Sequence, residues 1–249
     1  MPRLLTDDTM ETGKIGGLQK FTFSATRTDH LGATEYTLVT IAVDETGSTT
    51  GFEDELRGAL IAAVKKCQDP KNPRRNNLLL RVIKFSSSLA NGYEEIHGFK
   101  PIMEIDTALY PQLRPSGMTP LSDAGFSSVG ATNQYAEKLT ADDYGVNGIV
   151  FLITDGGDND STTTPKMIKD EVEKAVKGEH IESLVTILVG VNASQYKSEL
   201  EAFQKAAGIN MYCETCDLDK LGVFVSQSIS SQSLALGTGG PSQNIPATI

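Results

Sequence analysis

Four segments of this chain are nearly continuous runs of apolar residues, many of them β-branched. They are Tyr36–Val43, Asn77–Phe85, Asn147–Thr154 and Ser183–Val191. A run without polar alternation is typical of a strand that is buried on both faces of a sheet. These runs therefore predict a central sheet covered on both sides, which is the arrangement found in parallel α/β domains.

Segments with helical periodicity separate these runs. Apolar residues recur every three or four positions over residues 52–67, 121–139, 168–176, 196–207 and 218–229. Residues 209–213 add a short fifth strand, and we expect residues 93–105 to form an antiparallel edge strand. Strands that alternate with helices require right-handed crossovers. The sequence therefore predicts an α/β fold with a doubly wound, mostly parallel central sheet flanked by helices.

One domain accounts for most of the chain. We expect it to span residues 36–232, where strands and helices alternate. Residues 1–35 form an N-terminal extension that we expect to contribute one strand, an edge strand or hairpin arm at residues 20–27. Residues 233–249 form a C-terminal tail, rich in Gly, Pro and Ser from Gly237, which we expect to be disordered.

The composition disfavours several classes of function. The 32 acidic and 22 basic residues give a formal net charge of −10, which opposes binding to nucleic-acid phosphates. No apolar run approaches the ~20 residues of a transmembrane helix, and the N-terminus lacks the apolar stretch of a signal peptide. The 3 cysteines are too few for a disulfide scaffold. We therefore expect a cytoplasmic protein that binds neither nucleic acid nor a membrane.

Polar residues follow two of the buried strands, at the carboxyl ends where open parallel sheets bind ligands. The first run is followed by Asp44, Thr46 and Ser48, a carboxylate with hydroxyls two and four positions later. The third run is followed by Asp155. If these strands are neighbours where the strand order reverses, Asp44 and Asp155 face each other. Two close carboxylates repel unless a cation or a proton lies between them.

A third contribution comes from Thr119, just before the helix at residues 121–139. Its hydroxyl is expected to reach the same centre, although Thr119 before Pro120 also fits a helix N-cap followed by a favoured proline. The ligands are then all oxygen, from Asp44, Thr46, Ser48, Thr119 and Asp155. Such hard donors predict Mg²⁺ or Mn²⁺. The acidic loop at residues 158–160 is expected to be solvated on the same face.

Taken together, these motifs resemble a known site. The segments Asp44-Glu-Thr-Gly-Ser48, Gly117-Met-Thr-Pro-Leu121 and Thr154-Asp-Gly156 are similar to the three parts of the metal-ion-dependent adhesion site (MIDAS) of von Willebrand factor type A (VWA) domains. The resemblance covers roughly residues 36–232. Thr46 departs from it, since the family more often has Ser there. Glu45 is an added acid whose side chain is expected to point away from the site.

The resemblance implies a binding module rather than an enzyme, with the Rossmann-like fold of VWA domains. In such domains an acidic side chain of a partner protein, Asp or Glu, fills the open coordination position of the ion. By this resemblance Asp44 anchors the ion, while Thr46, Ser48 and Thr119 are hydroxyl ligands and Asp155 is a second-sphere carboxylate. Intracellular domains resembling this family often work beside AAA+ ATPases or in multi-protein assemblies, so such a partner is expected.

Other interpretations remain open. The loop beginning at Asp44 resembles the aspartyl-phosphate loop of haloacid-dehalogenase-like Mg²⁺-dependent phosphotransferases, but Thr46 stands where that family has its second acid. Alternatively, the chain is a structural subunit of an assembly and acts without a metal. The C-x-x-C of Cys213 and Cys216 lies at a strand–helix junction, where it is inert packing, a redox pair or part of a metal site.

Overall fold

The computed structural model describes residues 9–16, 18–178, 180–238, 241 and 244–249. These residues form one sheet whose eight strands lie in the order β1-β2-β5-β4-β3-β6-β7-β8. The strands are β1 (Met10–Ile15), β2 (Leu18–Thr26), β3 (Glu35–Asp44), β4 (Leu78–Phe85), β5 (Tyr93–Pro101), β6 (Gly145–Thr154), β7 (Leu184–Val191) and β8 (Met211–Thr215). Neighbouring strands are parallel except β1 with β2 and β4 with β5.

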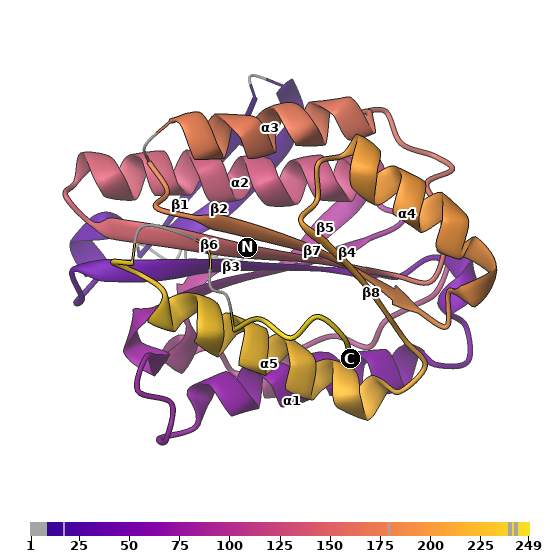
Figure 1. Cartoon of the computed structure of the whole chain (residues 1–249), viewed down its shortest axis with the longest axis horizontal. Coiled ribbons are helices and arrows are strands. Elements are labelled where there is room, and N and C mark those ends of the chain that lie inside the picture. The colour runs from indigo at the N-terminus through magenta and orange to yellow at the C-terminus, as the bar shows by residue number, and fades with distance from the viewer. Residues whose placement is uncertain (1–8, 17, 179, 239–240, 242–243) are drawn as a thin grey trace, which may run out of the picture.

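Helices cover both faces of this sheet, as Figure 1 shows. One face carries α1 (Glu53–Gln68) and α5 (Leu218–Leu234), and the other carries α2 (Leu121–Ala141), α3 (Pro165–Lys177) and α4 (Lys197–Ala206). Each face has its own apolar core. The predicted fold class, a doubly wound and mostly parallel sheet flanked by helices, is therefore confirmed. In the described part of the chain, no helix has the length and apolar content needed to cross a bilayer.

The central strands explain the apolar runs of the sequence. In β3, Val39, Ile41 and Val43 face the core under α1 and α5, whereas Leu38 and Ala42 face the core under α2. Successive side chains of a strand point to opposite faces. Because both faces of β3 are covered, both sets of side chains must be apolar, and the usual polar alternation is lost.

The sheet has two more strands beyond β5 than the predicted edge strand would leave, and both come from the N-terminal extension. β5 is antiparallel to β4, as expected, but β2 and β1 continue the sheet beyond it. The N-terminal extension thus contributes two strands rather than one, and residues 1–8 and 17 of that extension lie outside the described residues. Phe21, Phe23 and Ala25 of β2 are buried in the core beside α2. The extension is therefore an integral part of the domain.

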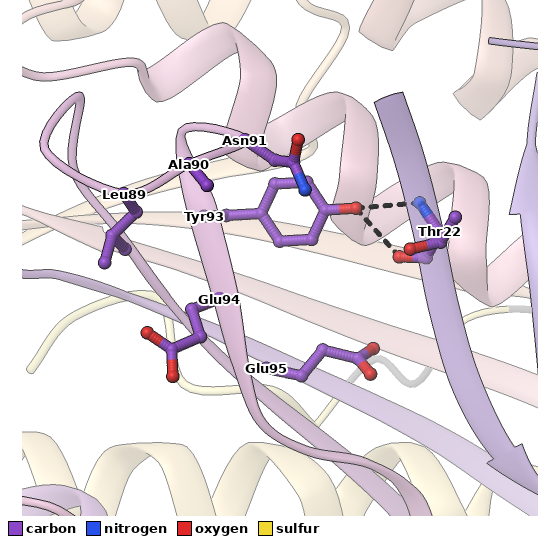
Figure 2. A pocket seen from close by; sticks show the side chains of 7 residues that line it. All are labelled: Thr22, Leu89, Ala90, Asn91, Tyr93, Glu94 and Glu95. Atoms are coloured by element: carbon purple, nitrogen blue, oxygen red, sulfur yellow. Dashed lines mark hydrogen bonds between the residues drawn. The ribbon is translucent and has the colours of Figure 1, made fainter. Parts of the chain in front are cut away.

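Side chains hold β2 to β5 where the two strands diverge. The strands pair at Ala25 and Phe99. Beyond that pair, the Tyr93 hydroxyl accepts a hydrogen bond from the Thr22 amide at 2.9 Å and donates one to the Thr22 carbonyl at 2.8 Å, as Figure 2 shows. The Glu95 carboxylate accepts from the amide of Ser24 at 3.1 Å. These contacts satisfy backbone groups that a regular ladder would otherwise pair.

The C-terminal segment returns to the domain after α5. The Sγ of Cys213 donates to the Ala247 carbonyl at 3.6 Å, and Ile245 and Ile249 pack against the core under α1 and α5. Residues 239–240 and 242–243 of the predicted tail lie outside the described residues. The described residues 244–249 thus lie against the domain. The boundary after residue 232 and the disorder of the tail stay predictions.

Gly98 of β5 tests how closely the N-terminal strands dock. A Cβ at this position would lie 2.1 Å from both the carbonyl oxygen and the Oγ of Ser24 in β2. We therefore expect Gly98→Ala to lower the free energy of unfolding by about 1–3 kcal/mol through overpacking, measured by urea denaturation. Gly58→Ala is the matched control, because nothing lies within 4 Å of a Cβ there and the exposed helix position should gain about 0.5–1 kcal/mol. Unchanged stability in Gly98→Ala would show that β2 is not held against β5.

Candidate metal centre

The strand order reverses between β3 and β6. From β3 the chain passes through α1 to β4 on one side, whereas β6 lies on the other side of β3. The register pairs Val43 with Ile153, so Asp44 at the end of β3 and Asp155 just after β6 reach the same edge of the sheet. Carboxyl ends of parallel strands at a reversal point form a crevice. The structure therefore places both predicted carboxylates at the edge of the sheet where ligands are expected to bind.

A chain of hydroxyl groups links three loops at this edge. Ser48 donates to Asp155 Oδ1 at 2.7 Å, the hydroxyls of Thr46 and Ser48 are 3.1 Å apart, and the Thr119 hydroxyl lies 3.5 Å from that of Thr46. Asp44 joins the same group, because its Oδ1 accepts from the Thr46 amide at 2.8 Å. All five predicted site residues are therefore brought together.

Both carboxylates of the centre are buried enough to have altered acidity. Burial raises the pKa of Asp44 to about 6, and the nearby Asp155 adds to this effect, although bonds from Thr46 and from the Thr154 hydroxyl oppose it. Burial also raises the pKa of Asp155, against the hydrogen bond from Ser48. A raised pKa means that the surroundings favour a neutralised carboxylate. A proton or a cation can supply that neutralisation.

Thr119 is held by its backbone and not by a helix-capping bond. α2 begins at Leu121 with Pro120 as its N-cap, and the Leu121 amide donates to Asp158 instead of to Thr119. Instead, the Thr119 amide donates to Asn159 Oδ1 at 2.7 Å, and the Thr119 carbonyl accepts from the Asn159 amide at 3.0 Å. Because Thr119 both donates a hydrogen bond to Asn159 and accepts one from it, the orientation of its backbone is fixed. Its hydroxyl is thereby left to face Thr46, so the interpretation of Thr119 as a helix cap is wrong.

The acidic loop after Asp155 has a structural role that the sequence analysis missed. Asp158 Oδ1 accepts from the Leu121 amide at 3.1 Å, and Asp158 also bonds the hydroxyl of Ser122. The expectation that this loop is simply solvated is therefore wrong for Asp158 and incomplete for Asn159. The available signal was an Asp/Asn-rich stretch after a strand end, since such side chains accept free backbone amides.

Glu45 points away from the centre, as expected. Its side chain is buried, forms an ion pair with Lys84 at 3.0 Å, and accepts from the amide of Arg114 at 2.6 Å. Within the described residues, no three His, Cys, Asp or Glu side chains gather as a metal site. The centre at Asp44 has two carboxylates and three hydroxyls, a donor set of oxygen alone.

Comparisons with known proteins identify the fold. No protein-family model and no curated protein matches the chain. A solved von Willebrand factor type A structure from Catenulispora acidiphila is 14% identical over 91% of this chain and 49% of its own, with a TM-score of 0.55. The pilus adhesin SpaC from Lactobacillus rhamnosus GG, in its open conformation, is 13% identical over 90% of this chain and 34% of its own, with a TM-score of 0.56. This chain has the VWA fold.

The likeness is one of fold, and it extends over most of this chain. The chain spans about a third to a half of the length of those two solved structures. In this VWA fold the reversal point lies between β3 and β6, where Asp44, Thr46, Ser48 and Asp155 meet Thr119. The three motifs that resemble a MIDAS are thus adjacent in space.

Removing the charge of Asp44 should stabilise the protein when metal is chelated. The ordinary pKa of the carboxyl is 3.8, so between about pH 4 and pH 6 the folded state holds a proton that the unfolded state has lost. The stability contributed by this group therefore falls as pH rises through that window, by up to about 3 kcal/mol. We expect Asp44→Asn to have a higher free energy of unfolding than the wild type at pH 7.

The replacement amide keeps both hydrogen bonds of the carboxylate. It accepts from the Thr46 amide and donates to the Thr154 hydroxyl, which can donate onward to the Gly156 carbonyl at 2.9 Å. The measurement is urea unfolding in a chelator at pH 4.5 and pH 7, and the difference between variants should shrink toward the lower pH. Asp142→Asn, at the exposed end of α2, is the control. An Asp44→Asn protein less stable than the wild type at pH 7 would contradict this account.

Cys213 and Cys216 differ in exposure. Cys213 is buried in β8, and burial raises its pKa to about 11, whereas Cys216 is exposed in the turn before α5. Cys67 in α1 is also buried. A protonated, buried thiol is a poor nucleophile. The structure therefore favours inert packing for Cys213 over a redox role.

Native thiol titration tests this assignment. With a chromogenic disulfide reagent at pH 8, we expect one cysteine to react quickly and the other two to react only after denaturation. Cys216→Ser should remove the fast phase, and Cys67→Ser should leave it unchanged. Two fast thiols that form a bond on mild oxidation would instead favour a redox pair.

Proposed function

We propose that this chain is a metal-dependent protein-binding module. In this proposal Asp44, Thr46, Ser48, Thr119 and Asp155 hold one Mg²⁺ or Mn²⁺ ion, and an Asp or Glu side chain of a partner protein completes its coordination. The observation that carries the proposal is the convergence of these five residues, from three separate loops, at the reversal point of the sheet.

The spacing of the oxygens supports such a centre. The hydroxyl of Thr46 lies 3.1 Å from that of Ser48 and 3.5 Å from that of Thr119. Adjacent ligands of an octahedral Mg²⁺ ion, with bonds near 2.1 Å, are about 3 Å apart. Small side-chain adjustments would therefore turn the hydroxyl chain into one set of neighbouring ligands. The raised pKa of Asp44 also supports a nearby cation, because the carboxylate is poorly solvated.

The donor chemistry supports the choice of ion. Carboxylate and hydroxyl oxygens suit Mg²⁺ and Mn²⁺, whereas Zn²⁺ prefers nitrogen or sulfur ligands. The two carboxylates give this centre no more negative charge than the ion has positive charge. If Asp155 acts through the Ser48 hydroxyl, as its 2.7 Å bond supports, the ion's direct ligands carry one negative charge. An ion that is incompletely neutralised attracts a further carboxylate.

The setting of the protein is part of the proposal. We place it in the cytoplasm, where the free cysteines Cys67, Cys213 and Cys216 would stay reduced. The partner would be a subunit of a multi-protein assembly, an AAA+ ATPase being one candidate, that presents an exposed acidic residue. Neither a nucleic acid nor a membrane is included, in keeping with the net charge of −10.

We propose no catalytic step for this site. A phosphotransferase would need Asp44 as an accessible nucleophile, but Asp44 is fully buried. Its two carboxylate oxygens are engaged by the Thr46 amide and the Thr154 hydroxyl. These contacts suit a residue that orients a loop and neutralises an ion.

Partner capture with and without metal tests the proposal. We expect the wild-type protein to retain a partner from native lysate in millimolar Mg²⁺. In a chelator the amount of retained partner should fall at least about tenfold, because binding depends on the ion. Asp44→Ala should fail in both conditions. Asp142→Ala, an exposed substitution at the C-terminal end of α2, should behave as the wild type.

Three outcomes would contradict the proposal. Partner retention that is unchanged by the chelator would exclude a role for the ion. Retention that survives in both Asp44→Ala and Thr119→Ala would favour a structural subunit that acts without metal. Turnover of a phosphate ester, abolished by Asp44→Asn, would favour the phosphotransferase.

A further inference from the structure

Glu45 belongs to the Asp44–Ser48 loop and contacts the segment that leads to Thr119. It directly follows Asp44, and the residue is only 2% exposed. The carboxylate reaches sideways to residues 114–117, the segment that leads to Thr119, where it accepts from the Arg114 amide at 2.6 Å. A buried carboxylate that accepts a backbone amide fixes the distance between two chain segments.

The backbones of the two loops are joined beside this contact. The Ser116 amide donates to the Glu45 carbonyl at 3.0 Å, and the Gly47 amide donates to the Gly117 carbonyl at 3.1 Å. Three hydrogen bonds thus join residues 45–47 to residues 114–117. One of them is the bond that the Glu45 side chain accepts from the Arg114 amide. The hydrogen-bonded segment 114–117 ends two residues before Thr119.

We propose that Glu45 is a positioning residue that sets the distance between the Asp44–Ser48 loop and Thr119, and thereby fixes the geometry of the ion's ligands. This inference rests on the proposed metal-binding function. The relevant property of Glu45 is the reach of its side chain to the Arg114 amide. Its negative charge is secondary.

The surroundings of Glu45 indicate that the length of its side chain matters more than its negative charge. Lys84 lies 3.0 Å from the Glu45 carboxylate, so the pair adds no net charge beside the ion. Lys84 also contacts Glu94 at 3.4 Å, which gives the ammonium a second partner if Glu45 is neutralised. A neutral side chain of the same length should therefore replace Glu45 with little loss.

Two substitutions separate reach from charge. Glu45→Asp keeps the charge but shortens the side chain by one methylene, so it should no longer reach the Arg114 amide. Glu45→Gln keeps the length and an oxygen that accepts this amide, but loses the charge. We expect Mn²⁺ affinity to fall about tenfold or more in Glu45→Asp, as for other residues that orient metal ligands, and by less than about threefold in Glu45→Gln.

The probe is Mn²⁺ alone, and bound ion is measured from the loss of the free-ion EPR signal. Glu95→Asp is the matched control, since Glu95 also accepts a backbone amide, from Ser24 at 3.1 Å, and pairs with Arg81 at 2.6 Å, away from the centre. It should lower the unfolding temperature without changing Mn²⁺ affinity. Equal affinities in Glu45→Asp and the wild type, or a loss in Glu45→Gln as large as in Glu45→Asp, would overturn the inference.

Hydrogen exchange in metal-free protein gives an independent readout. The amides of Arg114 and Ser116 should exchange faster in Glu45→Asp than in the wild type, and at the wild-type rate in Glu45→Gln. Unchanged exchange at Arg114 in Glu45→Asp would overturn the inference even if affinity fell. The proposed function fails in a different way, through a wild-type protein that binds no Mn²⁺ or binds it equally well after Asp44→Ala.

Discussion

Two acidic side chains at one buried edge of a sheet create the constraint around which this molecule is organised. β3 and β6 are neighbours, so Asp44 and Asp155 meet where water is largely excluded, and burial raises the pKa of both. Such a pair needs a compensating positive charge. The hydroxyls of Thr46 and Ser48, and the bonds that fix Thr119, are arranged around this requirement. The sheet topology brings the two buried carboxylates together, and the loops determine where a neutralising group can bind.

The sequence was sufficient for the parts that depend on strong local signals. Unbroken apolar strands can only be covered on both faces, and polar residues after such strands must gather at the edge where the order reverses. The N-terminal hairpin was underestimated because its docking depends on distant contacts, such as Ser24 against Gly98 and Thr22 against Tyr93. Asn159 was missed for a similar reason. Its two bonds to Thr119 arise only when the loops of two different strands meet.

The proposed function reconciles an acidic protein with an acidic partner. At a distance, the net charge of −10 repels other acidic proteins. Salt weakens both this repulsion and the attraction to the ion beyond about 8–10 Å, so an acidic side chain would be attracted only when it is close to the ion. Non-specific association would thus be suppressed while one well-placed carboxylate is accepted. The pairing of Glu45 with Lys84 fits this division, since it leaves the potential at the centre to the two aspartates and the ion.

The adjacency of β3 and β6 also bears on when the site exists. Thr154 bonds to Asp44 across 110 residues of sequence, so the site forms only after a distant segment has inserted beside β3. Contacts of such sequence separation close late in folding. On the ribosome, a nascent chain that has emerged only as far as α2 carries three of the proposed oxygen donors besides Asp44 but lacks β6 and Asp155. Under the proposed function, partner binding would therefore have to await complete folding, and an ion that binds only the native state would stabilise that state.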